Sequence, residues 1–303
     1  MKTPHTYALK SRAVAGVIRA ACITDVRAFK PGNVSFASPG HGMRAEDFVA
    51  SAQVMSVAIA APAADVGQRI LRAVEATQAV VQFNTNLGIV LLCAPLVHAA
   101  IGSSNELILC ERLRPVLAGL DEYDAELTYR AIRMAKPGGL GRSDRHDVAQ
   151  SPSVTLREAM GEASGRDRIA HQYVTDYRDI FETGLPALED GLARGLNREW
   201  AAVIVYLTFL ARYPDSHVAR KHGGEVAASV SLQARDLSQV LGRAGDPAQE
   251  MPELEAFDRQ LKARSINPGT SADMTVATLV AMDLEDSLDK VLLESRAEDG
   301  ASG

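Results

Sequence analysis

The stretch Leu87-Gly-Ile-Val-Leu-Leu-Cys-Ala-Pro-Leu-Val-His-Ala-Ala-Ile101 decides the fold, because it is apolar on every side. A helix that is hydrophobic all round belongs in a protein interior or in a membrane. This stretch is too short to cross a bilayer comfortably, contains Pro95 and follows the polar residues Asn84-Thr85-Asn86. We therefore predict a buried central helix around which other helices pack.

The rest of the chain also favours helices. Good helix formers dominate, aromatic residues make up only 5%, and alternating β-branched runs are scarce. The pattern predicts, among others, a helix over 166–182, a last helix over 270–287 and a non-helical stretch over 137–152. The expectation is an all-α fold, a single large helical bundle domain over 1–290, followed by a C-terminal tail over 291–303 that frays.

Charge and cysteine content narrow the class of protein. A net charge of -6 argues against a nucleic-acid binder or a protein of anionic membranes. The three cysteines, Cys22, Cys93 and Cys110, are too few and too scattered for a disulfide framework, which favours a reducing, cytoplasmic location. The sequence leaves a monomer and a homodimer both open.

Four polar clusters punctuated by Gly or Pro stand between the apolar segments. The first runs from Asp25 to Asn33, includes Lys30-Pro-Gly-Asn33 and is followed by Ser38-Pro-Gly-His41-Gly42. It combines a carboxylate, two cations and an amide, and a cation beside free backbone N–H groups suits phosphate oxygens. The second is Asn84-Thr85-Asn86. One of these residues is enough to cap the apolar helix, so three polar residues in a row also suggest ligand binding. In both, helix-end chemistry is the alternative to ligand binding.

The third cluster runs from Asp215 to Gly224 and includes His217, Arg220 and Lys221 on one face of a short helix, with Gly223 after it. The fourth contains Ser271 and Asp273. Thr270 and Asp273 have the spacing of a capping box, while an Asp at a helix mouth also suits Mg²⁺ or a sugar hydroxyl. Capping and ligand binding both remain open here. A further loop runs from Gly138 to Asp147, and its Asp144, His146 and Asp147 could ligate a metal ion; a mobile lid and a structural loop are the alternatives.

Taken in order, the clusters resemble the triphosphoribosyl-dephospho-CoA synthase family, the ATP:dephospho-CoA triphosphoribosyltransferases. Lys30-Pro-Gly-Asn33 looks like that family's Lys-Pro-Gly motif, and Asn84-Thr-Asn-Leu-Gly88 corresponds to its Asn-Thr-His-Lys-Gly. Asp215-Ser-His217 with Arg220 and Gly223-Gly224 is similar to its Asp-Thr and Arg-Gly-Gly segments, and Pro268-Gly-Thr-Ser-Ala-Asp273 to its Pro-Gly-Gly-Ser-Ala-Asp. The resemblance runs from about residue 10 to residue 287.

The resemblance implies an all-α transferase that joins ATP and 3′-dephospho-CoA and releases adenine, with Mg²⁺ accompanying ATP. His41, His217 and Asp215 become candidate catalytic residues, and Asp215 and Asp273 candidate Mg²⁺ ligands. The candidate substrate-binding residues are Lys30, Asn33, Asn84, Thr85, Asn86, Arg220, Lys221, Gly223, Gly224 and Ser271. Small phosphorylated molecules are the expected partners, without nucleic acid or membrane.

The pair Asn86-Leu87 stands where the family pattern has His-Lys, and this departure leaves two alternatives open. One is a biosynthetic enzyme on the same scaffold that acts on another phosphorylated substrate, in methanopterin- or methanofuran-type one-carbon cofactor synthesis. The other is a non-catalytic ligand-binding protein.

Overall fold

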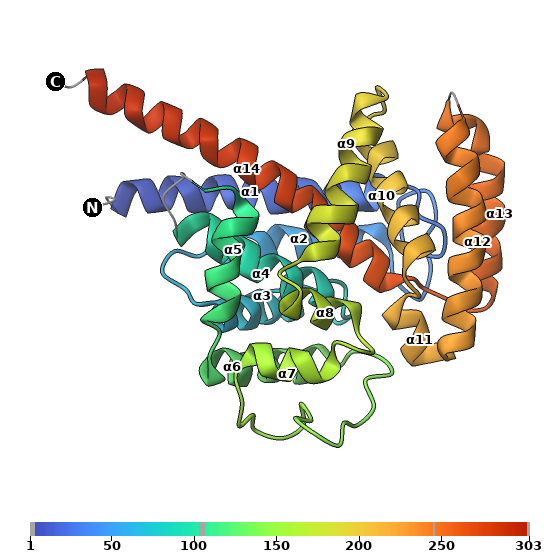
Figure 1. The fold of residues 1–303 in the computed structure, drawn as a ribbon, viewed down its shortest axis with the longest axis horizontal. Helices are drawn as coiled ribbons and strands as arrows, with labels where there is room; N and C mark the ends of the chain where they lie inside the picture. Colours follow the sequence, from blue (N-terminus) through green and yellow to red (C-terminus); the bar gives the residue numbers. More distant parts are fainter. Residues whose placement is uncertain (1–3, 103–106, 245, 302–303) are drawn as a thin grey trace.

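The computed structural model describes residues 4–102, 107–244 and 246–301, and over these ranges the chain is helical and forms no sheet (Figure 1). The α-helices are α1 (Pro4–Arg27), α2 (Ala45–Ile59), α3 (Val66–Val80), α4 (Leu87–Gly102), α5 (Leu109–Ala118), α6 (Glu122–Ala135), α7 (Leu156–Ala163), α8 (Arg168–Val174), α9 (Leu185–Ala193), α10 (Arg198–Arg212), α11 (Ser216–His222), α12 (Gly224–Arg243), α13 (Met251–Ala263) and α14 (Gly269–Ala301). A π-helical turn, η1 (Ile180–Gly184), precedes α9, and a 3₁₀ turn, η2 (Pro247–Glu250), precedes α13. The all-α prediction is confirmed.

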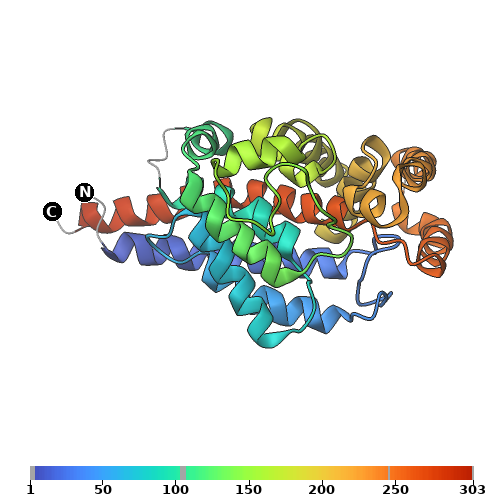
Figure 2. The ribbon, with the colours of Figure 1, turned by 90° about the horizontal axis from the view of Figure 1, so that it is seen from below.

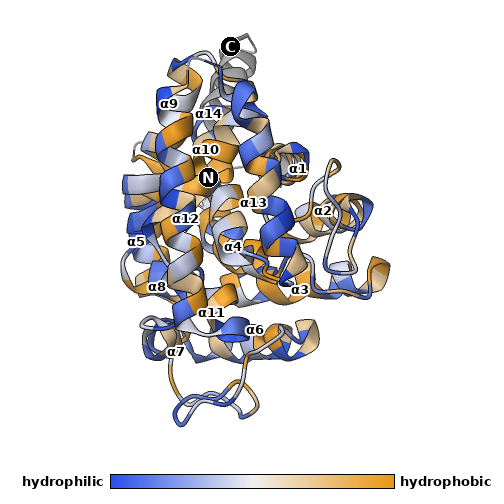
Figure 3. Cartoon of the chain, turned by 90° about the vertical axis from the view of Figure 1, so that its right-hand side faces the viewer, coloured by the Kyte–Doolittle hydropathy of each residue, from blue (hydrophilic) through white to orange (hydrophobic). Residues whose placement is uncertain are grey.

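The predicted central helix is α4, and nearly all of its residues are buried. The two longest helices, α1 and α14, run side by side past it, and both chain ends lie at the same end of the molecule (Figures 1 and 2). Helices α2, α3 and α6 cover one flank of this centre, while α9, α10 and the α12–α13 pair extend from the other. The buried apolar residues of these helices form one core cluster, and the loop after α6 is mostly hydrophilic (Figure 3).

Pro95 interrupts the hydrogen bonding of α4, and a tyrosine repairs it. Proline has no N–H, so the Leu91 carbonyl loses its donor within the helix. The buried Tyr173 hydroxyl donates to that carbonyl at 2.7 Å, and the Tyr177 hydroxyl donates to the Leu92 carbonyl at 2.9 Å. Both bonds fasten the α8 region to the central helix.

The predicted helix over 166–182 is wrong, because α8 ends at Val174. Asp176 and Tyr177 adopt left-handed backbone angles, with φ of 53° and 61°, and turn the chain back. In a continuous helix, Asp179 would stand about 16 Å along the axis from Arg168. After the turn, it accepts two hydrogen bonds from the Arg168 guanidinium, at 2.7 and 2.8 Å, and one from Gln172. A non-local ion pair therefore outweighs local helix propensity.

The last helix is longer than predicted. It runs past residue 287 to Ala301, because the good helix formers continue beyond the apolar pattern. Ser302 and Gly303, the end of the tail predicted over 291–303, lie outside the described residues.

Candidate functional site

A cavity of about 630 Å³ opens between α4, α11, the start of α14 and the loops that follow α1 and α6. All four sequence clusters reach its wall, as does the 137–152 stretch. The predicted site residues that line it are Asn33, His41, Asn84, Thr85, Asn86, His217, Arg220, Lys221 and Asp273. The predicted site residues that do not line it are Lys30, Asp215, Ser271, Gly223 and Gly224.

Lys30 lies just behind the wall. Its ammonium group is fully buried, 2.6 Å from an Asp25 carboxylate oxygen, and it donates to the Asn33 side chain at 3.0 Å. Asn33 in turn donates to the Asn267 side chain at 2.9 Å. The predicted phosphate contact would therefore require Lys30 to leave Asp25. In this arrangement, its charge instead holds Asp25 and Asn33 at the cavity surface.

His41 is held by the same loop. Its Nε2 lies 2.8 Å from the Gly32 carbonyl oxygen, so this nitrogen carries the hydrogen and Nδ1 has a free lone pair. Burial lowers the pKa of His41, and the nearby Lys262 and Lys221 charges act in the same direction. His41 is thus neutral at neutral pH, which suits a proton acceptor.

The polar run before α4 is used structurally as well as at the cavity. Asn84 accepts a hydrogen bond from the Leu87 N–H at 3.1 Å, as an N-terminal cap does. The Thr85 hydroxyl lies 2.6 Å from that of Ser51 on α2, and Asn86 donates to Thr77 on α3 at 3.0 Å. These contacts account for three polar residues where one cap would suffice.

Asp215 joins α11 to α14 with both carboxylate oxygens. One accepts the backbone N–H groups of His217 and Val218 at 2.9 and 3.1 Å. The other accepts the backbone N–H and hydroxyl of Ser271 at 2.7 and 2.8 Å. Burial raises the pKa of Asp215, and these bonds oppose the rise. Asp215 therefore serves as a helix cap. In this arrangement, neither carboxylate oxygen is free for the metal-binding and catalytic roles that were predicted for it.

The cavity side of α11 carries His217, Arg220 and Lys221. Arg220 pairs with Asp167 at 2.5 Å, whereas Lys221 has no hydrogen bond or ion pair with the described residues. Burial, followed by the Lys221 and Arg220 charges, lowers the pKa of His217 to about 3. His217 is therefore a neutral ring at neutral pH. After this helix, Gly223 has a φ of 91°, which makes the turn into α12.

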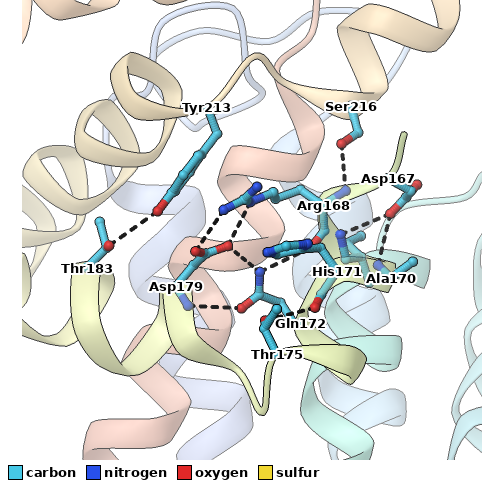
Figure 4. Close-up of polar contacts among 11 residues, drawn as sticks. Asp167, Arg168, Ala170, His171, Gln172, Thr175, Asp179, Thr183, Tyr213 and Ser216 are labelled. Atoms are coloured by element: carbon cyan, nitrogen blue, oxygen red, sulfur yellow. Dashed lines mark hydrogen bonds and ion pairs between the residues drawn. The ribbon is translucent and has the colours of Figure 1, made fainter. Parts of the chain in front are cut away.

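A network behind α11 fixes its position (Figure 4). The Arg168 guanidinium lies 3.7 Å above the Tyr213 ring and forms the two bonds to Asp179. The Arg168 backbone N–H donates to the Ser216 hydroxyl at 2.7 Å, at the first residue of α11. Burial opposes ionisation of Asp179, but the bonds from Arg168 and Gln172 outweigh it and lower its pKa.

Two carboxylates reach the cavity with oxygens that accept no hydrogen bond. Asp273 has no hydrogen-bond partner among the described residues, and Oδ1 of Asp25 is buried without one. Burial, then the charges of Asp25 and Asp215, raises the pKa of Asp273 well above its usual range. Gly88 provides the space for Asp273, because a Cβ there would lie 2.0 Å from its Oδ2.

Sequence reasoning placed Asp25 in the first cluster but did not select it as a site residue. The available signal was a carboxylate in the last turn of α1, beside Cys22 and Val26 on the buried face of the helix. It also missed the cations of the loop after α6 and Arg166, which line the same cavity.

Within the described ranges, no three or more His, Cys, Asp or Glu side chains are grouped closely enough to hold a metal ion. A search of the same residues finds no helix with the length and apolarity to cross a membrane.

The fold and the cavity define an all-helical protein whose acidic, basic and amide side chains converge on one ligand-sized space. The chain belongs to the ATP:dephospho-CoA triphosphoribosyl transferase family, whose model matches residues 11–291. The family is one of transferases that act on small phosphorylated molecules.

Named relatives agree with this membership. The chain is 31% identical over 138 residues to a probable 2-(5″-triphosphoribosyl)-3′-dephosphocoenzyme-A synthase of Citrobacter koseri, covering 46% of this chain and 45% of that protein. It is 27% identical over 128 residues to one of the same name from Pectobacterium carotovorum, covering 42% and 40%. The match thus spans less than half the length of these relatives.

A solved structure from Archaeoglobus fulgidus, provisionally described as a triphosphoribosyl-dephospho-CoA synthase, shares the fold. It superposes with a TM-score of 0.57 at 24% identity, over 78% of this chain and 97% of that one.

Proposed function

We propose that this protein transfers the triphosphoribosyl group of ATP to 3′-dephospho-CoA and releases adenine. Family membership supports the reaction class, and the observation that carries the proposal is the convergence of all four sequence clusters on one cavity. In the reaction, a ribose 2′-oxygen of dephospho-CoA forms a bond to the anomeric carbon of ATP, and the bond from that carbon to adenine breaks. The hydroxyl proton leaves the acceptor, and adenine leaves with a proton.

The cavity offers a group for each task. The anomeric carbon gains positive charge in the transition state, and the Asp25 carboxylate can stabilise it electrostatically. His41, neutral and with Nδ1 free, is the candidate acceptor for the hydroxyl proton. The raised pKa of Asp273 favours its protonated form, which makes it the candidate donor to departing adenine.

Mg²⁺ with ATP is part of the proposal. The free oxygens of Asp25 and Asp273 fit the donor set that Mg²⁺ takes from proteins, one or two carboxylates completed by phosphates and water. When bound, the ion would supply positive charge to the triphosphate. Asp215, predicted to share this role, has both oxygens engaged with α11 and α14.

The test incubates purified protein with ATP, Mg²⁺ and dephospho-CoA and follows free adenine by chromatography and the product by mass. We expect adenine and product in equal amounts, and neither without the acceptor. An absence of adenine in the complete mixture, from protein that is folded and binds ATP, would refute dephospho-CoA as the acceptor.

A further inference from the structure

The cavity wall contains four cations that none of the sequence clusters includes. They are Lys136, Arg142, Arg145 and Arg166, from the loop after α6 and the residues before α8. The acidic side chains in this wall already interact with other groups of the protein. Asp147 accepts the backbone N–H groups of Ser143 and Ala149 at 2.7 and 2.8 Å, and Glu162 lies 3.7 Å from Arg145. Lys136 and Arg142 form no hydrogen bond or ion pair with described residues.

The loop that carries these cations is anchored rather than loose. The Tyr129 hydroxyl donates to the His146 carbonyl at 2.7 Å, and Arg133 donates to the Val148 carbonyl at 2.6 Å. Arg166 donates to the Ser143 hydroxyl at 3.0 Å, which ties its guanidinium to the loop. The backbone is therefore fixed on α6 while its basic side chains stay exposed at the cavity.

Two glycines bring this loop onto α11. A Cβ on Gly138 would lie 2.8 Å from Cε of Lys221, and a Cβ on Gly139 would lie 3.1 Å from the Arg220 carbonyl oxygen. Gly139 also has a φ of 75°, which an L side chain rarely adopts. With these two side chains absent, the loop cations and those of α11 form one continuous basic wall.

The charges of this wall match a polyphosphate. Six cations among the described residues line this part of the cavity, and the carboxylates of Asp167, Glu162 and Asp147, which line it too, offset three of them. The net of three positive charges (six minus three) is taken up in full by a triphosphate, which carries about four negative charges at neutral pH because its terminal phosphate has a pKa near 6. A diphosphate diester arm, with about two charges, would leave one of them without a partner. The proposed function places Asp25 and Asp273 at the anomeric carbon, so their part of the cavity is where the ribose lies.

We propose that the loop over 136–148, Arg166 and the cations of α11 form the subsite for the triphosphate of the nucleotide donor, with its ribose directed toward Asp25 and Asp273. The identity of the donor rests on the proposed function, whereas the polyphosphate chemistry does not. In this assignment, the loop binds the triphosphate, and the nucleotide donor lies with its triphosphate at the loop and its ribose at Asp25 and Asp273.

The experiment measures binding by calorimetry with three probes: inorganic tripolyphosphate, ATP and dephospho-CoA. The test variant is Arg142→Ala/Arg166→Ala. Both residues are exposed, so we expect the variant to fold as the wild type does, and its melting temperature checks this. Arg259→Ala is the matched control, because Arg259 is 70% exposed on α13, pairs with Glu255 and does not line the cavity.

We expect the double variant to bind tripolyphosphate and ATP at least about tenfold more weakly, because it loses two charged hydrogen-bond donors to the phosphates. Its affinity should also depend less steeply on salt, and Arg259→Ala should match the wild type. No tripolyphosphate binding by the wild type, or equal binding by the double variant, would overturn the proposal. A loss confined to dephospho-CoA would also overturn it, in favour of an acceptor subsite.

The proposed function is tested separately by adenine release. If tripolyphosphate binds through Arg142 and Arg166 but no adenine forms with dephospho-CoA, the subsite stands and the proposed reaction fails.

Discussion

Replacing Gly88 by alanine tests whether the position of Asp273 matters for the reaction. The added Cβ would lie 2.0 Å from Oδ2 and 2.5 Å from Cγ of Asp273, and 2.8 Å from Cδ1 of Ile169. Ordinary van der Waals contact begins near 3.4 Å, so the carboxylate must retreat by about 1.4 Å (from 2.0 to 3.4 Å). The backbone of α4 is buried among other helices and leaves the side chain of Asp273 as the group that moves.

The expected cost is kinetic. A misplacement of about 1 Å in a catalytic group costs about a hundredfold in rate, or about 2.7 kcal/mol in the barrier. We therefore expect kcat for adenine release to fall about a hundredfold or more in Gly88→Ala. Stability should change less, because alanine favours a helix over glycine by about 1 kcal/mol and offsets part of the crowding.

The assay follows adenine release at saturating ATP and dephospho-CoA, with thermal melting in parallel. Gly16→Ala on α1 is the control: a Cβ there meets no atom within 4 Å, so it should add helix stability without changing the rate. Wild-type turnover in Gly88→Ala, with a structure showing the Asp273 carboxylate displaced, would refute the reasoning that this carboxylate must stand where it does.

Three further outcomes follow from the contacts described. Tyr173→Phe should lower the free energy of unfolding by about 1–3 kcal/mol, since it leaves the Leu91 carbonyl buried without a donor; an unchanged denaturation midpoint would contradict this. Asp273→Asn should weaken Mg²⁺-dependent ATP binding and leave the melting temperature equal or higher, because folding raises the pKa of Asp273 and its ionisation above about pH 4 therefore opposes folding. Unchanged ATP affinity in calorimetry with Mg²⁺ present would remove Asp273 from the site. The pKa of His217 falls from 6.5 to about 3 on folding, so between these pH values the unfolded chain binds a proton that the folded chain does not. The wild type should thus lose stability as pH falls through this window, and His217→Gln should lose less, as melting temperatures from pH 7 to pH 4 would show.

The fold was predictable because its main signal is local. The all-apolar stretch over 87–101 requires burial, and the surrounding helix-forming composition leaves helices as the elements that bury it. The predicted helix over 166–182 contains both Arg168 and Asp179, but helical periodicity does not show that they pair through a turn at Asp176 and Tyr177.

The candidate site was predictable as a set of segments but not as a set of side-chain directions. Lys30 belongs to a cluster that reaches the cavity, yet Asp25 draws its ammonium group inward. Asp215 likewise turns toward Ser271, because unsatisfied N–H groups at two helix starts need an acceptor. Arg142 reaches the cavity although it was not predicted as a site residue. It lies in an irregular loop whose path depends on hydrogen bonds to Asp147 and to α6, and a sequence pattern does not show these contacts.

The pairing of α14 with α1 has a consequence for how the chain is made. Helix α14 is synthesised after every other described helix, yet its buried face, including Met274, Val276 and Leu279, packs into the centre of the protein against α1, α4 and α10. The ribosome adds residues at about 5–20 per second, so many seconds pass between the synthesis of α4 and that of α14. During this time, α1, α4 and α10 lack the helix that covers their apolar faces. The nascent protein therefore depends on α14 to close both the core and the cavity wall. A chain released before α14 is made would expose the apolar faces of the helices that were synthesised first.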